Sequence, residues 1–151
     1  MIVKKQVSNL LDIRGDLMML DWLEIDSSLG FFEGSSFFKE SRREFAEHGP
    51  EKMSTGLTSR GDKIGRLPAT TAIEAMAQAS AAALMLKLGQ TDVPLIAKVA
   101  VTIRSGISPG ELRIRGEIRR VRGALAQIDV RCLQNSREAI SGQLLYGGFT
   151  P

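Results

Sequence analysis

Hydrophobic and polar residues alternate with a period of two along the last third of the chain. Ile114 lies between two arginines, and Val130 lies between Asp129 and Arg131. This alternation is typical of β-strands that bury one face. Short turn sequences separate the runs, at residues 108–110, 122–123 and 135–136. The pattern therefore predicts four strands after residue 98, joined as an antiparallel meander.

Two further strands are expected nearer the start of the chain. The first lies near residues 20–27, and the second, over 31–39, contains four phenylalanines. Serine and glycine at 27–30 form the turn between them. Residues 40–66 are polar and rich in glycine, without a clear period, so they are expected to form a long loop.

Residues 68–88 form the most clearly defined element, a helix. Pro68 suits a first helical turn, Gly89 is a typical C-terminal stop, and good helix formers fill the space between them. The helix is about 30 Å long. Its alanines lie nearly all the way round, so it is expected to be buried on most sides. Charged residues within it, such as Glu74, argue against a membrane span.

The order of these elements predicts an α+β fold. Two strands, a long loop, one long buried helix and four strands follow one another along 151 residues. A single helix is buried this thoroughly only if a sheet curls around it. The length fits one domain, so residues 1–151 are expected to form a single unit.

Composition narrows the chemistry that this domain can perform. Cys132 is the only cysteine and His48 the only histidine, so no metal centre and no internal disulfide are expected. The formal net charge of +3 is mild, and no aromatic residues interleave with the arginines, so nucleic acid is not an expected partner. The first residues lack the apolar run of a signal peptide, and a cytoplasmic location is expected.

Glu74 is the anomalous residue of the predicted helix. A carboxylate is rarely buried unless it has a partner, so in a central helix Glu74 would face a cavity, an interface or a bound molecule. There burial would raise its pKa and keep it as a proton donor. The alternative is a solvated position near the helix start, where a carboxylate favours the helix dipole. Gln78, one turn later on the same face, can hydrogen-bond to Glu74 or to a ligand.

The segment 67–78, with the sequence LPATTAIEAMAQ, resembles the central helix of the hotdog-fold 3-hydroxyacyl-[acyl carrier protein] dehydratases. Segments 17–21 and 108–112 resemble two further motifs of that family, and the similarity covers most of residues 16–148. The resemblance implies a hotdog fold, in which a curved antiparallel sheet wraps around one long central helix. It also implies a homodimer whose sheets join edge to edge.

The resemblance further implies an active site between two protomers that needs no cofactor. A histidine from one protomer would take the α-proton, and Glu74 from the other would protonate the departing hydroxyl group. Aligning residues 45–50 with the family's histidine motif selects His48 as the base. Counting back from Glu74 without gaps selects Arg60 instead, which cannot act as a base and is expected to contact the substrate. A backbone N–H near Ala69 would polarise the thioester carbonyl, although Ala69 replaces the family's glycine.

The function expected from the resemblance is the dehydration of 3-hydroxyacyl thioesters to trans-2-enoyl thioesters in fatty-acid-type biosynthesis. Two alternatives remain open: a non-catalytic hotdog protein that binds acyl thioesters or serves as a partner subunit, and a hotdog thioesterase in which Glu74 activates water. An acyl carrier protein is the implied donor. Since carrier proteins are acidic, the exposed pair Arg120 and Arg122 is expected to form a docking surface for it.

Overall fold

The structure is a computed structural model that describes residues 2–6, 20–38 and 66–150, with the backbone alone for 2–6. His48 and Arg60 therefore lie outside the described residues. The elements follow one another along the chain in the order β1 (Ile2–Gln6), β2 (Trp22–Asp26), β3 (Phe31–Phe38), α2 (Ala69–Leu88), β4 (Leu95–Ile103), β5 (Gly110–Arg122), β6 (Leu125–Gln134) and β7 (Arg137–Gly147).

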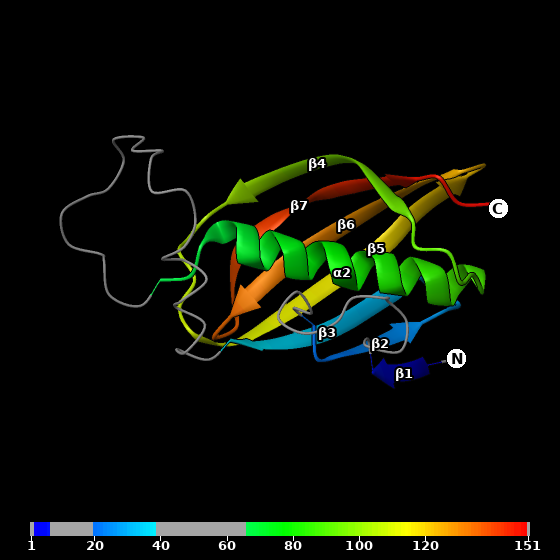
Figure 1. Ribbon diagram of the computed structural model, residues 1–151. Coiled ribbons are helices and arrows are strands. Elements are labelled where there is room, and N and C mark those ends of the chain that lie inside the picture. Colours follow the sequence, from blue (N-terminus) through cyan, green and yellow to red (C-terminus); the bar gives the residue numbers. More distant parts are fainter. Residues whose placement is uncertain (1, 7–19, 39–65, 151) are drawn as a thin grey trace.

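The strands form one antiparallel sheet that curves around α2 (Figure 1). Across the sheet the order is β1-β2-β3-β5-β6-β7-β4. The predicted α+β architecture, a curved antiparallel sheet wrapped around one long helix, is confirmed. The helix begins at Ala69, one residue after the predicted start. Gly89 caps its C-terminal end with a positive φ of 66°, a conformation that favours glycine.

The path of β4 differs from the predicted meander. β4 does not pair with β5, the next strand in sequence, but with β7, where Ile96 lies opposite Tyr146 and Ile103 opposite Ile140. The reason is that both edges of β5 are already occupied, by β3 on one side and β6 on the other. β4 therefore lies at the outer edge of the sheet, beyond β7. β1, at the opposite edge, was not predicted.

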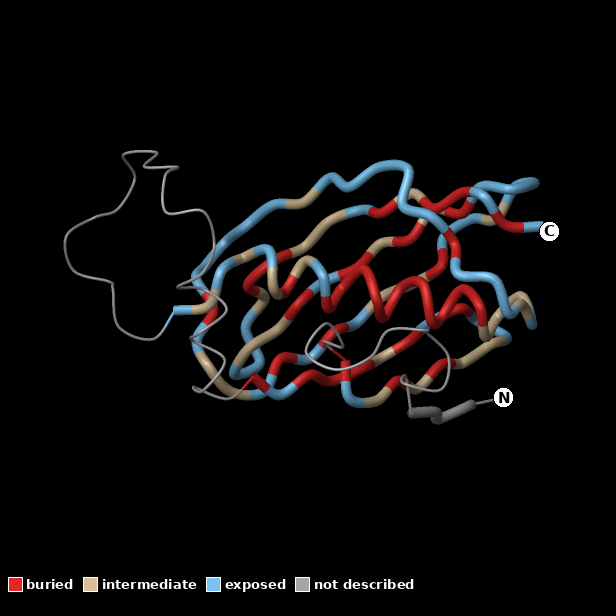
Figure 2. The backbone as a smooth tube through the Cα atoms, viewed as in Figure 1, coloured by how far each residue is buried: buried red, intermediate tan, exposed pale blue. Residues whose placement is uncertain are grey.

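The core lies between the inner face of the sheet and α2. Every residue of the helix from Ala75 to Met85 is buried, as predicted, and Figure 2 shows this continuous buried stretch. Small side chains allow this close packing. On the sheet, the ring of Phe32 covers Gly116, and Gly142 lies against the backbone of β4. A side chain at either glycine would occupy space that the neighbouring strand already fills.

Gly142 provides a test of this packing. In Gly142→Ala the new methyl group would meet the carbonyl oxygen of Ala100, and it would lie 2.7 Å from the Cα atom of Val101. Because these are backbone atoms, they cannot rotate away. We expect the free energy of unfolding to fall by about 1–3 kcal/mol, as for other overpacked sites, when it is measured by urea denaturation.

The matched control is Gly147→Ala. A methyl group there would make only an ordinary contact, 3.4 Å from the side chain of Leu125. Alanine also restricts the unfolded chain, so this variant should be as stable as the parent protein or gain up to about 1 kcal/mol. Equal losses in the two variants would contradict the packing argument.

Candidate active site

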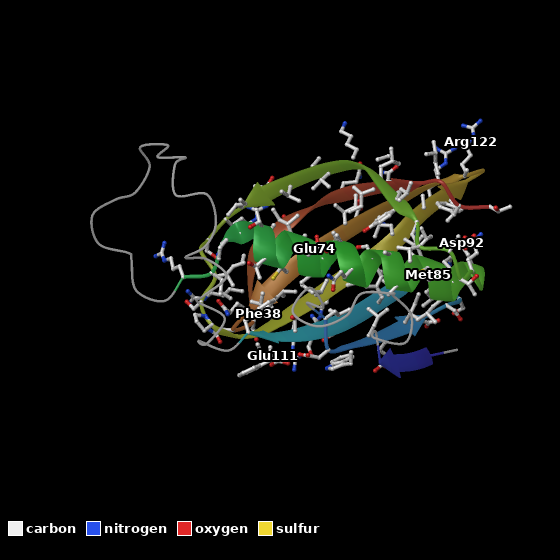
Figure 3. The ribbon with its side chains drawn as sticks, viewed as in Figure 1. Phe38, Glu74, Met85, Asp92, Glu111 and Arg122 are labelled. Atoms are coloured by element: carbon white, nitrogen blue, oxygen red, sulfur yellow. The ribbon has the colours of Figure 1, made fainter. Side chains whose placement is uncertain are left out.

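Glu74 is the sixth residue of α2 and interrupts the buried surface of the helix. Its neighbours Ala72 and Ala75 are buried, whereas the Glu74 side chain is exposed (Figure 3). Thr70, four residues earlier on the same face, is exposed as well. The solvated position considered from the sequence is thus the one found in the isolated chain. The carboxylate is available to a second molecule on this flank of the helix.

A buried amide group holds the Glu74 carboxylate in place. The Nε2 atom of Gln78 donates a hydrogen bond to Oε1 of Glu74 over 3.0 Å. The Gln78 side chain is only 3% exposed, so packing restricts its rotation. An exposed glutamate normally samples several rotamers, and this hydrogen bond reduces that freedom. The i, i+4 spacing in the sequence indicated the interaction, because such residues face each other on a helix.

Tyr146 fixes the direction in which this helix face points. Its hydroxyl group donates a 2.6 Å hydrogen bond to the carbonyl oxygen of Ala77, and Ser80 bonds to Met76 beside it. Burial raises the pKa of the Tyr146 phenol well above its usual range, so it remains a neutral donor. Tyr146 lies on β7 directly opposite β4. The Glu74 charge also raises the pKa of this phenol, so the carboxylate lies near Tyr146, on the side of the helix that faces β7 and β4.

β4 presents an uncovered apolar edge on that same side. Leu95 is 70% exposed and Ile103 55% exposed, and almost the whole strand is drawn as exposed in Figure 2. One edge of its backbone pairs with β7, and the other has no described strand beside it. Natural proteins rarely leave a long apolar edge strand without protection, because it pairs readily with another chain. An unpaired edge and the exposed carboxylate therefore lie on one side of the fold.

In the first turn of α2, the backbone N–H groups of Ala69 and Thr70 have no acceptor among the described residues, whereas that of Thr71 bonds to the carbonyl oxygen of Pro68. Pro68 occupies the N-cap position and makes no side-chain cap, and the first turn contains no acidic residue. Ala69, predicted to contact the substrate, lies half-buried at the first helical position. The first N–H groups of a helix have no partner within it and carry a partial positive charge. This end is suited to a carbonyl oxygen or an anion.

The two arginines predicted to dock a carrier protein lie far from this end. Arg120 and Arg122 are exposed on the β5–β6 hairpin, and Figure 3 shows Arg122 at the end of the molecule where α2 ends, whereas Glu74 lies in the first half of that helix. Glu74 is about 21 Å from the C-terminal end of its helix, counting 1.5 Å per residue. The structure thus brings together Ala69, Glu74 and Gln78, but it does not bring the two arginines to them.

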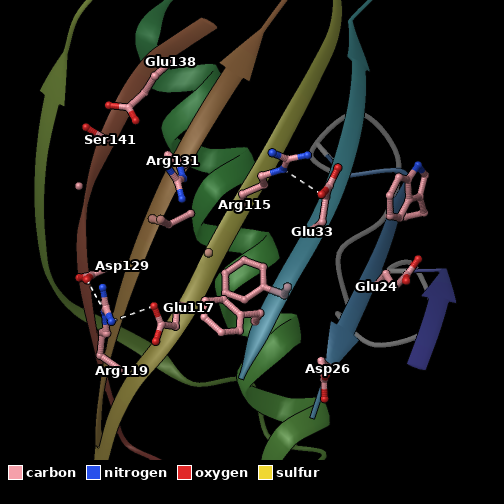
Figure 4. Close-up of a pocket in the computed structure, with 16 residues that line it drawn as sticks. Glu24, Asp26, Glu33, Arg115, Glu117, Arg119, Asp129, Arg131, Glu138 and Ser141 are labelled. Carbon is pink, nitrogen blue, oxygen red and sulfur yellow. Dashed lines mark hydrogen bonds and ion pairs between the residues drawn. The ribbon is translucent and has the colours of Figure 1, made fainter. Parts of the chain in front are cut away.

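Two grooves in the described part of the chain lie away from Glu74. One groove, of about 750 Å³, lies on the outer face of the sheet (Figure 4), and a second, of about 380 Å³, lies beside the β6–β7 turn. Within the same residues no group of three or more histidine, cysteine, aspartate or glutamate side chains is placed to hold a metal ion. No described helix is long and apolar enough to cross a membrane.

A search of the solved structures finds hotdog-fold proteins that are provisionally named as thioesterases. A phenylacetic acid degradation-related protein from Ralstonia eutropha JMP134 aligns with a TM-score of 0.63 and 10% identity, over 82% of this chain and 80% of that one. A protein from Lactococcus lactis aligns with 0.60 and 7% identity, over 85% and 86%. A Streptococcus pneumoniae TIGR4 protein, solved with coenzyme A, aligns with 0.57 and 13% identity, over 80% of each chain.

These neighbours confirm the hotdog fold, and they correct the expected activity. The enzyme class predicted from the resemblance, a 3-hydroxyacyl-[acyl carrier protein] dehydratase, is wrong, because these neighbours carry the names of hydrolases. The helix motif around Glu74 led to that prediction. A glutamate on the central helix serves either reaction, so the motif alone did not separate a lyase from a hydrolase. No protein-family model and no curated protein sequence matches the chain.

Cys132 is excluded as a nucleophile and offers a test of the core. Its side chain is fully buried on β6, and burial raises the pKa of the thiol to about 12. At pH 8 only about one thiol in ten thousand would be ionised, and the thiolate is the reactive form. We expect Ellman's reagent not to react with the native protein within minutes. After unfolding in urea, one thiol per chain should react, and rapid labelling of the native protein would contradict this burial.

Proposed function

We propose that the protein is a hotdog thioesterase that hydrolyses acyl thioesters, with Glu74 as the group that activates water. The observation that carries the proposal is the exposed carboxylate of Glu74, which is held by the buried Gln78 on a helix that is otherwise largely buried. The hotdog fold, whose neighbours include thioesterases by name, supports the same class of substrate. One of these neighbours was solved with coenzyme A, which favours a thioester of that carrier.

In the proposed reaction Glu74 takes a proton from a water molecule as that water attacks the thioester carbonyl carbon. The C–S bond then breaks, and the sulfur leaves as a thiolate that takes up a proton. A carboxylate is suited to the first step because it is ionised at neutral pH. Gln78 holds one carboxylate oxygen and leaves the other to face the water. No metal ion or redox cofactor is required to balance these steps.

The start of α2 is proposed to stabilise the negative charge that develops on the carbonyl oxygen. The N–H groups of Ala69 and Thr70 belong to the uncapped first turn, and Thr70 shares the exposed face with Glu74. Amide donors directed at a developing oxyanion commonly contribute about 3–4 kcal/mol to such reactions. The methyl group of Ala69 does not block this role, because the donors belong to the backbone.

The site is proposed to be completed by a second copy of the chain that pairs along β4. Pairing would cover the apolar β4 edge and extend the sheet into the partner protomer. Tyr146 directs the helix face that bears Glu74 toward this edge, so the partner would form one wall of the site. The exposed Glu74 carboxylate would then be enclosed between the two protomers.

Glu74→Gln tests the catalytic role directly. The variant keeps the shape of the side chain but removes the base, so we expect kcat for acyl-coenzyme A hydrolysis to fall by about 10²–10⁴-fold. KM should change little, because substrate binding does not require the charge. The matched control is Glu111→Gln, which neutralises an exposed glutamate at the start of β5 and should retain full activity.

Gln78→Leu tests the proposed positioning of the carboxylate. Leucine is of similar size and stays compatible with the buried site, but it cannot donate a hydrogen bond to Glu74. We expect kcat to fall by about 10-fold, or roughly 1.4 kcal/mol, with KM unchanged. Saturable binding of acyl-coenzyme A without hydrolysis by the parent protein would contradict the proposed function and indicate a binding protein instead.

Ile103→Lys tests the β4 interface. A lysine in each copy would place like charges at the paired edge, a device that natural edge strands use to prevent association. We expect the solution mass to fall to that of one chain, 16.5 kDa, and the hydrolytic activity to be lost with it. Leu125→Lys, which changes an exposed leucine on β6, should leave both unchanged. An active single chain would disprove the shared site.

A further inference from the structure

Two residues of α2 are exposed, and they lie on the same face of the helix. Along the described helix, Ala69–Leu88, Thr70 and Glu74 are exposed, whereas every other residue is buried or half-buried. Residues four apart in a helix are neighbours on its surface, with about 5–6 Å between their Cβ atoms. Gln78, four residues after Glu74, continues the row. Thr70, Glu74 and Gln78 thus form a polar strip along a helix whose other faces pack in the core.

The hydroxyl group of Thr70 makes no hydrogen bond with any other residue in the described part of the chain. Other polar side chains of this helix are engaged: the Ser80 hydroxyl group donates to the carbonyl oxygen of Met76, and the Gln78 amide group donates to Glu74. Capping does not account for Thr70 either, because Pro68 occupies the N-cap position. The hydroxyl group is therefore available to a molecule that binds beside Glu74.

The side chains of the polar strip extend in one direction. The Cα–Cβ bonds of a helix tilt toward its N-terminus, so a long side chain covers the turn before its own. The Gln78 amide group accordingly reaches back to Glu74, with 3.0 Å between Nε2 and Oε1. By the same rule the Glu74 carboxylate reaches back toward Thr70. Since Gln78 holds Oε1, the second oxygen, Oε2, is the one expected to face the Thr70 hydroxyl group.

We infer that the Thr70 hydroxyl group binds the water molecule that attacks the thioester, an inference that rests on the proposed thioesterase function. A water between Oε2 of Glu74 and Oγ1 of Thr70 would lie about 2.7–2.8 Å from each oxygen. Two oxygens bridged in this way are about 4.5–5.5 Å apart, which matches the spacing of neighbouring side chains on one helix face. The water would then be held at two points instead of one.

Each atom of the bound water has one role in this arrangement. One hydrogen is donated to Glu74, which takes it as a proton during the attack, and the other is donated to Oγ1 of Thr70. The water oxygen forms the new bond to the carbonyl carbon, the C–S bond breaks, and the thiolate takes the proton from Glu74. Thr70 neither gains nor loses a proton, because a hydroxyl group accepts a hydrogen bond while keeping its own hydrogen.

The position of Thr70 also places this water beside the substrate. The backbone N–H groups of Ala69 and Thr70 are proposed to hold the carbonyl oxygen. Since the N–H and the hydroxyl group of Thr70 belong to one residue, a carbonyl group held by the first has its carbon close to the second. A water bound by Glu74 alone could approach from several directions. Fixing the reacting atoms in one geometry is a large source of rate enhancement in enzymes.

Thr70→Val tests the inferred role, because valine keeps the branched shape but cannot accept a hydrogen bond. We expect kcat for acyl-coenzyme A hydrolysis to fall by about 10–100-fold with KM little changed, since the water loses one of its two contacts. Thr70→Ser restores the hydroxyl group and should recover most of the activity. The matched control, Thr71→Val, makes the same change at the next residue, which is half-buried on a different face, and should retain full activity.

The double variant Thr70→Val/Glu74→Gln separates this role from a structural one. If Thr70 acts only on the water that Glu74 activates, its replacement should cost no further activity once Glu74 is replaced. Losses that multiply in the double variant would show that Thr70 acts independently of that water, and they would overturn the inference. Equal melting temperatures of the parent and Thr70→Val would establish that the helix is intact.

The remaining outcomes distinguish the inference from the proposed function. Full activity of Thr70→Val beside an inactive Glu74→Gln would overturn the inference and leave the proposed function in place. Full activity of Glu74→Gln would overturn the proposed role of Glu74 together with the inference that rests on it. A threonine hydroxyl group can also act as a nucleophile. An acyl group found on Thr70 by mass spectrometry of the quenched reaction would show covalent catalysis and overturn the water-binding role.

Discussion

The burial of one small-residue helix inside a curved sheet is the constraint on which this structure depends. Alanine side chains let α2 lie close to the inner face, so the sheet can enclose the helix on most of its circumference. The larger buried side chains of the helix, those of Met76, Leu84 and Met85, complete the contact with the sheet. A helix enclosed in this way has few positions left at which a polar side chain reaches the surface. Glu74 occupies one of them.

The enclosure of the helix also buries polar groups, which then need hydrogen-bond partners. The hydroxyl groups of Tyr146 and Ser80 are buried at the helix–sheet interface, and each donates a hydrogen bond to a helix carbonyl group. Buried polar groups must be satisfied in this way, since an unpaired one costs about 1–3 kcal/mol. The bond from Tyr146 also sets the rotation of the helix about its axis. Through this bond, the packing of the core also determines where Glu74 lies relative to the β4 edge.

The two faces of the sheet make different kinds of contact. The inner face holds the helix, whereas the outer face holds ion pairs such as Arg115–Glu33 and Arg119–Asp129. Ion pairs of this kind on an exposed surface add little stability, commonly about 1 kcal/mol or less. The stability of the fold therefore comes mainly from the apolar contacts of the inner face.

The sequence by itself determined the elements and the candidate carboxylate, because both depend on local periodicity. Alternation around Ile114 and Val130 specified the strands, and the alanine run specified the helix and singled out Glu74. The alternation did not specify the partner of β4, since pairing with β5 or with β7 buries the same face. Only the tertiary structure decided that β4 is an edge strand, because that outcome depends on β3 pairing with the edge of β5 that β4 would otherwise use. The hydrolase names of the structural neighbours likewise followed from the fold, since a helix glutamate alone is compatible with more than one reaction on a thioester.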